Sequence, residues 1–159
     1  LMQHGQSHEA FDATATAALR SVFATEDAGA RRKTFVVVFQ RGACDGLEVL
    51  LIRRTDSGTW QSVTGSKDAE HEDWQSTAVR EVHEEVGVWV RDVRYVRSQP
   101  WPFPHSLMLG FRASYDHGDI VCDPSEIMDA QWFRRDDMPM IPSNISIARS
   151  LIDDWLHNN

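Results

Sequence analysis

The sequence of 159 residues contains only two cysteines, and it has fewer basic than acidic side chains. Cys44 and Cys122 are too few for a zinc ribbon or a framework of disulfides, so we expect reduced thiols and a cytoplasmic protein. The formal net charge of −8 argues against the broad basic surface that non-specific binding to nucleic acid requires. A small phosphorylated ligand is compatible with this charge, because bound metal ions can supply the positive charge.

Long apolar runs are also missing from the sequence. No stretch reaches the roughly 18 apolar residues that a membrane-spanning helix needs. Residues 1–10 lack the basic and apolar blocks of a signal peptide. The length fits one domain with a substantial core. We therefore expect no association with a membrane, a leading helix and linker at residues 1–32, and a single domain at 33–159.

A crowded group of carboxylates distinguishes the middle of the sequence. Glu81, Glu84 and Glu85 stand at positions i, i+3 and i+4, which places them on one stretch of helix surface. We expect this helix to begin near Glu72. Its apolar stripe comprises four residues: Trp74, Ala78, Val82 and Val86. Glu81 and Glu85 then project close to the edge of the stripe, and not into solvent on the opposite side.

Carboxylates packed this closely beside an apolar wall repel one another and resist ionisation unless a cation offsets their charge. Mg²⁺ and Mn²⁺ prefer oxygen ligands and meet that requirement. Taken alone, the three glutamates would also fit an ordinary solvated acidic helix with Arg80 as their internal partner. The residues around them favour the metal site.

From Glu72 to Val88 the sequence reads E-x7-R-E-V-x-E-E-x-G-V, and Gly87 is suited to cap the end of the helix. This run resembles the Nudix box, G-x5-E-x7-R-E-U-x-E-E-x-G-U, in which U is a bulky apolar residue. One departure is that six residues, instead of five, separate Gly65 from Glu72. Either the loop is one residue longer or Ser66 takes the place of the glycine. The metal contact that the resemblance implies for the backbone carbonyl at Gly65 therefore stays open.

The hydrophobic pattern predicts strands and helices that alternate irregularly, which indicates a mixed sheet covered by helices on both faces. Strands are expected at 35–39, 47–53, 88–97 and 107–115, with shorter ones opening at Ile120 and at 131–133, and a closing helix at 145–155. Periodicity alone supports an α/β or α+β domain. The resemblance to Nudix proteins implies their α/β/α sandwich, with a mixed β-sheet and the box as a loop–helix–loop.

A proline-rich segment, S-Q-P-W-P-F-P-H-S at residues 98–106, is the second unusual feature. Its three prolines fix φ and remove backbone donors, so the segment cannot be a central strand and should be stiff and extended. Trp101 and Phe103 on such a backbone could stack on a base or a nicotinamide ring, or fill the core beneath the loop. Trp60 is a further stacking candidate, for which packing in the core is an equal alternative.

This segment, a short distance after the box, resembles the signature of NADH pyrophosphatases. Members of that family cleave the pyrophosphate of NAD(H) to nicotinamide mononucleotide and AMP, and can remove NAD caps from RNA. The resemblance implies an NAD(H)-type dinucleotide as substrate, with NAD-capped RNA as a further one. It also implies ring stacking by Trp101 and Phe103, polar contacts from Gln99 and Ser106, and a role for Glu126 as a metal ligand or base.

The first half of the sequence is similar to a different family. Leu50–Arg54 and Trp60–Ser66 are more similar to dihydroneopterin triphosphate pyrophosphohydrolases, and the sequence does not contain the four-cysteine zinc ribbon usual in NADH pyrophosphatases. Two alternatives therefore stay open: hydrolysis of a nucleoside or pterin triphosphate, and a non-catalytic Nudix-like sensor that binds NAD or ADP-ribose. The leading helix could cover an apolar surface on its own sheet or on a second copy, so a homodimer also stays open.

The resemblance implies a metal-dependent hydrolysis. The ions, Mg²⁺ or Mn²⁺, would be held by four glutamates: Glu81, Glu84, Glu85 and Glu126. Either Glu85 or Glu126 would take a proton from the attacking water. Arg80 would pair with Glu72 or Glu81 to fix the helix and orient the ligands.

Overall fold

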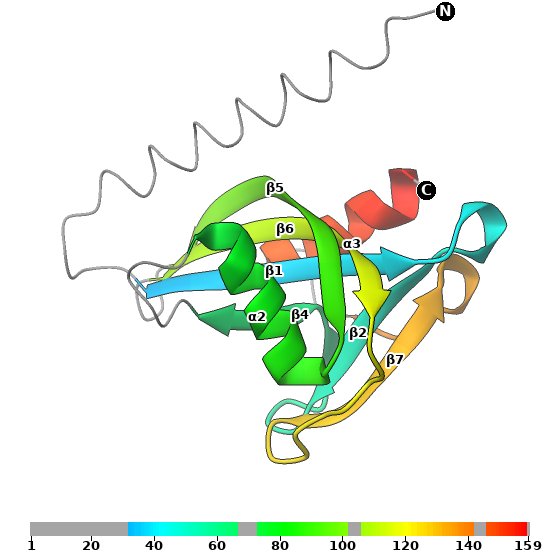
Figure 1. Cartoon of the computed structure of the whole chain (residues 1–159), viewed down its shortest axis with the longest axis horizontal. Helices are drawn as coiled ribbons and strands as arrows, with labels where there is room; N and C mark the ends of the chain where they lie inside the picture. Colours follow the sequence, from blue (N-terminus) through cyan, green and yellow to red (C-terminus); the bar gives the residue numbers. More distant parts are fainter. Residues whose placement is uncertain (1–31, 67–72, 102–105, 142–145, 159) are drawn as a thin grey trace, which may run out of the picture.

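The computed structural model describes residues 32–66, 73–101, 106–141 and 146–158 (Figure 1). Within these ranges one seven-stranded sheet carries a helix on each face. The strands are β1 (Arg32–Arg41), β2 (Glu48–Arg54), β3 (Trp60–Gln61), β4 (Val63–Ser66), β5 (Trp89–Trp101), β6 (Ser106–His117) and β7 (Ile127–Arg134). The helices are α2 (Trp74–Val86) and α3 (Ile147–Asn158), with short 3₁₀ turns η1 (Cys44–Gly46) and η2 (Arg135–Asp137).

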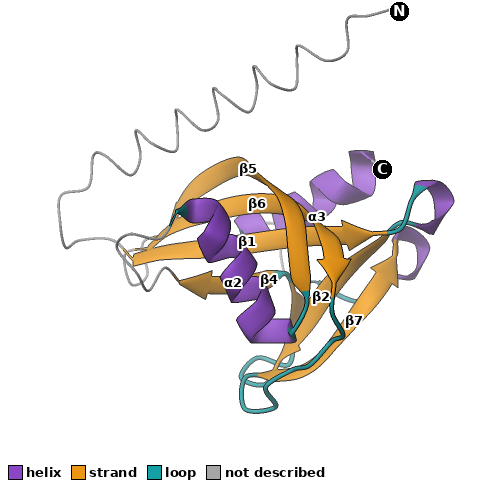
Figure 2. Cartoon of the chain, in the orientation of Figure 1, coloured by secondary structure: helices purple, strands orange, loops and turns teal. Residues whose placement is uncertain are grey.

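The sheet is mixed, as the sequence predicted. Strands β1 and β6 run parallel, whereas β1 pairs with β2 and β4, and β5 with β6, in antiparallel fashion. The main strand order is β3-β2-β1-β6-β5, with β4 also pairing with β1 and β7 with β2. Figure 2 shows α2 on one side of the sheet and α3 on the other. The expected α/β/α sandwich is therefore confirmed.

The core has two halves, because side chains of the central strand β1 alternate between the faces. Phe35, Val37 and Phe39 are buried with the apolar stripe of α2, whereas Val36 and Val38 are buried with α3. This burial on both faces explains the continuous apolar run in the sequence. In the part of the chain that the structure describes, no helix is long and apolar enough to cross a membrane.

The box helix begins at Trp74, two residues later than expected. The side chain of Asp73 accepts a hydrogen bond from the backbone N–H of Ser76 at 2.8 Å, which makes Asp73 the N-cap. Gly87 ends the helix in the left-handed conformation at φ 77°, as predicted for a capping glycine. Glu72 lies outside the described residues.

Two strand predictions need correction. Ile120 does not open a strand: it lies in the loop between β6 and β7, where the N–H of the next residue, Val121, donates to the carbonyl of Val86 at the end of α2. Ile120 packs against the core instead. The residues just before the box, for which no strand was predicted, form the short strands β3 and β4, because β2 and β1 offer them free edges.

The strand that leads into the proline-rich segment is at the edge of the main sheet path. Within β5, Pro100 pairs with Leu107 of β6, and its other side needs no backbone donor. The register of β5 shifts between Arg91 and Arg94, where Asp92 has a φ of 53°. The strand is therefore irregular at that point. The leading helix and the residues at 102–105 lie outside the described part of the chain.

Candidate active site

Helix α2 places the three box glutamates in three different environments. Glu81 is buried, Glu85 is half-buried and Glu84 is exposed. This order agrees with the expectation that Glu81 and Glu85 flank the apolar stripe. Arg80 Nη1 donates to Glu81 Oε1 at 3.1 Å and to Glu84 Oε2 at 3.0 Å, so it bridges two of the three carboxylates. The predicted pairing of Arg80 with Glu81 is thus present.

The carboxylate of Glu81 lies directly against the backbone of Gly65 in β4. A Cβ atom added at Gly65 would stand 1.9 Å from Glu81 Oε2 and 2.2 Å from its carboxyl carbon. Only a glycine permits this approach, since any side chain would displace the carboxylate. The packing of Glu81, a predicted metal ligand, therefore requires a glycine at position 65.

Glu85 faces Glu126, which is far from it in the sequence. Burial raises the pKa of Glu85 to about 7, and the negative charge of Glu126 contributes next. One carboxylate oxygen of Glu85, Oε2, is buried and has no hydrogen-bond partner among the described residues. A buried carboxylate oxygen without a partner is costly unless a proton or a cation occupies it.

The end of β2 fixes the position of Glu126. The backbone N–H of Thr55 donates to the carbonyl of Glu126 at 3.0 Å, and the Glu126 N–H donates to the carbonyl of Asp123 at 3.1 Å. Ser125 is held by the side chain of Asp123, which completes a tight turn before β7. The backbone of this turn is therefore well anchored, while the side chain of Glu126 is exposed.

Arg54 is the site residue that the sequence did not single out. It ends β2, and its guanidinium pairs with Asp56 at 3.1 Å. The hydrogen bond to Asp56 raises the pKa of Arg54 most, and the charges of Glu85 and Glu126 add to this effect. Arg54 is therefore a cation beside two carboxylates. A basic residue at a strand end is too common in sequences to have indicated this by itself.

The donor set suits a hard divalent ion. It consists of carboxylate oxygens, and one of them, Glu85 Oε2, has no partner. Within the described ranges, no group of three or more His, Cys, Asp or Glu side chains converges on one point. Arg80 engages Glu81 and Glu84.

Two residues predicted to bind substrate lie away from the box glutamates. Gln99 Oε1 accepts a hydrogen bond from the backbone N–H of Ile147 at 2.7 Å, at the start of α3 on the opposite face. Trp60 packs in the α3-side core and meets Phe133 edge-on, with ring centroids 4.9 Å apart. The contact of Gln99 is that of a residue that caps a helix, and the contact of Trp60 is that of a residue packed in the core.

The remaining predicted residues are only partly visible. Trp101 and Ser106 pair with each other through the backbones of β5 and β6. Their side chains, and the whole of Phe103, lie outside what the structure describes. Their roles as stacking and polar contacts therefore stay predictions.

Comparison with known proteins shows where this arrangement belongs. The NUDIX domain family model matches residues 30–155. NAD-capped RNA hydrolase NudC of Escherichia coli (strain K12 / DH10B) is 44% identical over 116 residues, which cover 67% of this chain and 45% of that protein. The chain thus spans less than half the length of this relative.

Solved structures agree on the fold. The MutT NUDIX hydrolase from Burkholderia pseudomallei superposes with a TM-score of 0.63 at 20% identity, over 79% of this chain and 98% of the other. The NUDIX domain of Shewanella oneidensis NrtR, crystallised with ADP ribose, gives a TM-score of 0.66 at 18% identity, over 87% and 97%. With a family model that matches most of its length and with this fold, the chain belongs to the Nudix family.

Proposed function

We propose that the chain hydrolyses the pyrophosphate linkage of NAD(H)-type dinucleotides, giving nicotinamide mononucleotide (oxidised or reduced) and AMP. The observation that carries the hydrolytic part is the half-buried Glu85, whose partnerless oxygen lies in a group with Glu126 and Arg54. Such a group can hold and move a proton next to a bound phosphate. Similarity to a NAD-capped RNA hydrolase supports the substrate class and extends the proposal to NAD-capped RNA.

The metal ligands that we propose are Glu81, Glu84, Glu85 and Glu126. A bound Mg²⁺ or Mn²⁺ would offset the charge of the pyrophosphate and lower the pKa of a water molecule. Glu85 or Glu126 then accepts the proton of the water whose oxygen attacks phosphorus. The bond from phosphorus to the bridging oxygen breaks, and each nucleotide leaves with its own phosphate.

Other residues of the chain would position these groups. Arg80 keeps Glu81 and Glu84 oriented through its two hydrogen bonds. Arg54 adds a fixed positive charge beside Glu85 and Glu126, where negative charge of the substrate accumulates. Thr55 anchors the backbone of Glu126, whose negative charge already acts on Glu85.

Trp101 and Phe103 are the proposed stacking residues for the nicotinamide or adenine ring, and Ser106 the proposed polar contact. The hydrogen bond from Ile147 supports a capping role for Gln99 in place of the expected substrate contact. The edge-on contact with Phe133 likewise supports packing for Trp60.

Product analysis of the purified chain with NADH tests the proposal. Reduced nicotinamide mononucleotide plus AMP should appear with Mg²⁺ or Mn²⁺ and disappear with a chelator. Glu85→Gln should abolish both products, whereas Glu48→Gln, which alters a carboxylate at the other end of β2, should not. Turnover of dihydroneopterin triphosphate but not NADH would contradict the substrate assignment. Tight NADH binding without cleavage would establish a sensor instead of an enzyme.

A further inference from the structure

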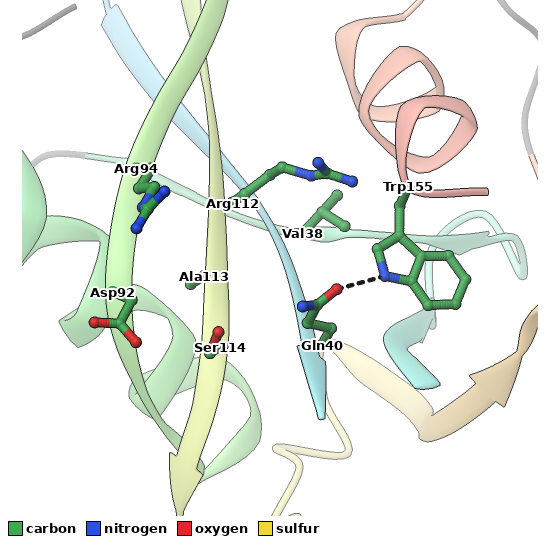
Figure 3. Close-up of a pocket in the computed structure, with 8 residues that line it drawn as sticks. All are labelled: Val38, Gln40, Asp92, Arg94, Arg112, Ala113, Ser114 and Trp155. Atoms are coloured by element: carbon green, nitrogen blue, oxygen red, sulfur yellow. Dashed lines mark hydrogen bonds between the residues drawn. The ribbon is translucent and has the colours of Figure 1, made fainter. Parts of the chain in front are cut away.

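A cavity of about 240 Å³ opens on the α3 face of the sheet, and none of the predicted site residues is among those that line it. Figure 3 shows its walls: Asp92 and Arg94 on β5, Arg112 and Ser114 on β6, Gln40 on β1 and Trp155 on α3. Register explains why these side chains meet. Arg112 is paired with both Arg94 and Val38, and Ser114 with Gln40, so they share one face of three neighbouring strands.

The positive charges at this cavity exceed the negative ones that could neutralise them. The Asp92 carboxylate pairs with Arg91 at 2.6 Å, and the Asp154 carboxylate pairs with Arg97. Each acidic group near the cavity thus already has a basic partner. Arg94 and Arg112 are left without a carboxylate within ion-pair distance among the described residues.

Arg112 carries the strongest sign of a missing partner. Its Nη2 atom is buried and makes no hydrogen bond within the part of the chain that the structure describes. Burial lowers the pKa of the Arg112 guanidinium; the negative charge of Asp154 opposes this shift, and the positive charge of Arg97 adds to it. A guanidinium stays charged in proteins, so a buried, unpaired N–H of this kind is costly unless an acceptor occupies the space in front of it.

The other polar groups of the cavity can donate hydrogen bonds. Trp155 Nε1 donates to Gln40 Oε1 at 2.9 Å, which occupies the acceptor end of the Gln40 amide. In Figure 3 the amide nitrogen of Gln40 lies on the side away from Trp155. Ser114 adds a hydroxyl on the same face. Guanidinium, amide and hydroxyl donors together match a ligand that offers several acceptor oxygens.

We propose that this cavity is an oxyanion site that binds a phosphoryl group, as inorganic phosphate or as the phosphate of a small nucleotide. Arginine recognises phosphate through paired hydrogen bonds, and the dianion would balance the two guanidiniums. The cavity is smaller than sites for drug-sized ligands, which fits a phosphoryl group better than a whole dinucleotide. This inference does not rest on the proposed hydrolysis.

A titration observed by NMR tests the site. Among the six tryptophans, the indole N–H signal of Trp155 can be identified by its loss in Trp155→Phe. Inorganic phosphate, added at constant ionic strength with EDTA present, should shift this signal and reach saturation. The titration is repeated in Glu85→Gln, which should not hydrolyse NADH, and EDTA removes divalent ions in both cases. A missing phosphate signal would therefore contradict this site without bearing on the proposed hydrolysis.

Variants then assign the binding to the cavity. Arg112→Met should weaken phosphate binding about tenfold or more, because charged hydrogen bonds are lost. Arg94→Gln, at an exposed position that the fold tolerates, should also weaken it, while Arg135→Gln on η2 should not. AMP binding more tightly than inorganic phosphate would identify a nucleotide ligand, and equal affinity would identify free phosphate. Absence of a saturable shift, or a phosphate affinity in Arg94→Gln and Arg112→Met that is unchanged from wild type, would overturn the proposal.

Discussion

The α2 face and the α3 face of the sheet each bury one atom of an ionisable side chain that has no hydrogen-bond partner among the described residues; one side chain is acidic and the other is basic. On the α2 face it is an oxygen of Glu85, and on the α3 face a nitrogen of Arg112. The net charge of −8 for the whole chain does not indicate the local charge at either of these two positions. Under our two proposals, one sheet presents a cation-binding group on one side and an anion-binding group on the other, and the apolar side chains of β1 separate them.

The largest expected effect is loss of catalysis on the α2 face. Glu85→Gln and Glu81→Gln should each lower kcat for NADH by about 10²–10⁴-fold, as removal of a proton-transfer group or metal ligand does. The melting temperature should change little, since glutamine keeps the shape. Steady-state kinetics and thermal unfolding of both variants and of Glu48→Gln would check this. Near-normal turnover in either active-site variant would show that the carboxylates are assigned wrongly.

Gly65→Ala should break the same face without removing a carboxylate. Its Cβ would stand 1.9 Å from Glu81 Oε2, so Glu81 must move. We expect activity to fall about 10- to 100-fold, the usual cost of disturbing a metal ligand. Gly46→Ala is the matched control, because a Cβ there meets nothing within 4 Å. Equal activities of the two alanine variants would contradict the close packing of Glu81 on β4.

The pH dependence of stability should distinguish the faces in metal-free protein. Because the pKa of Glu85 is raised from 4.5 to about 7, the folded protein keeps a proton that the unfolded chain releases. The contribution of Glu85 to stability is then full below pH 4.5 and is lost as the pH rises to 7. Its size is reduced by solvent screening, since the group is only half-buried.

Thermal unfolding in EDTA at about pH 5 and about pH 8 gives the measurement. Wild type should lose more stability between these values than Glu85→Gln, which cannot titrate. Arg112→Met should keep the wild-type difference, since its group does not change charge in this range. Identical losses in wild type and Glu85→Gln would show that Glu85 titrates normally.

The smallest effect concerns Gln99, on the α3 face. Gln99→Leu removes the acceptor for the Ile147 N–H and should cost about 1 kcal/mol of stability, as for a lost helix cap. Kinetic constants for NADH should stay as in wild type. Gln99→Glu keeps an acceptor oxygen and should restore the stability. A higher KM for NADH with unchanged stability would return Gln99 to the substrate site.

Local patterns in the sequence sufficed for much of the box. Helical spacing placed Glu81 and Glu85 at the edge of the buried stripe, and Gly87 was correctly assigned to the helix end. These features depend on residues within a few turns of one another. The family match extended the same reasoning to the sandwich fold.

Features that depend on distant pairings could not be predicted from the sequence. Arg54 joins the site because β2 ends beside the turn that carries Glu126. The cavity on the α3 face exists because β1, β5 and β6 align Arg94, Arg112 and Gln40 in register. The assignment of Ile120 to a strand was wrong, because this apolar side chain packs against the core although its backbone lies in a loop.

The parallel pairing of β1 with β6 has a consequence for how the chain folds. Arg32 pairs with Ser106 and Gln40 with Ser114, so the centre of the sheet closes only when residues far apart in the sequence meet. Pairings of such long range form slowly. Phe35–Phe39 is the apolar segment of the first described strand. During synthesis it stays unpaired with β6 until β6 has been made. This run is therefore where chaperone binding or aggregation of the nascent chain should begin.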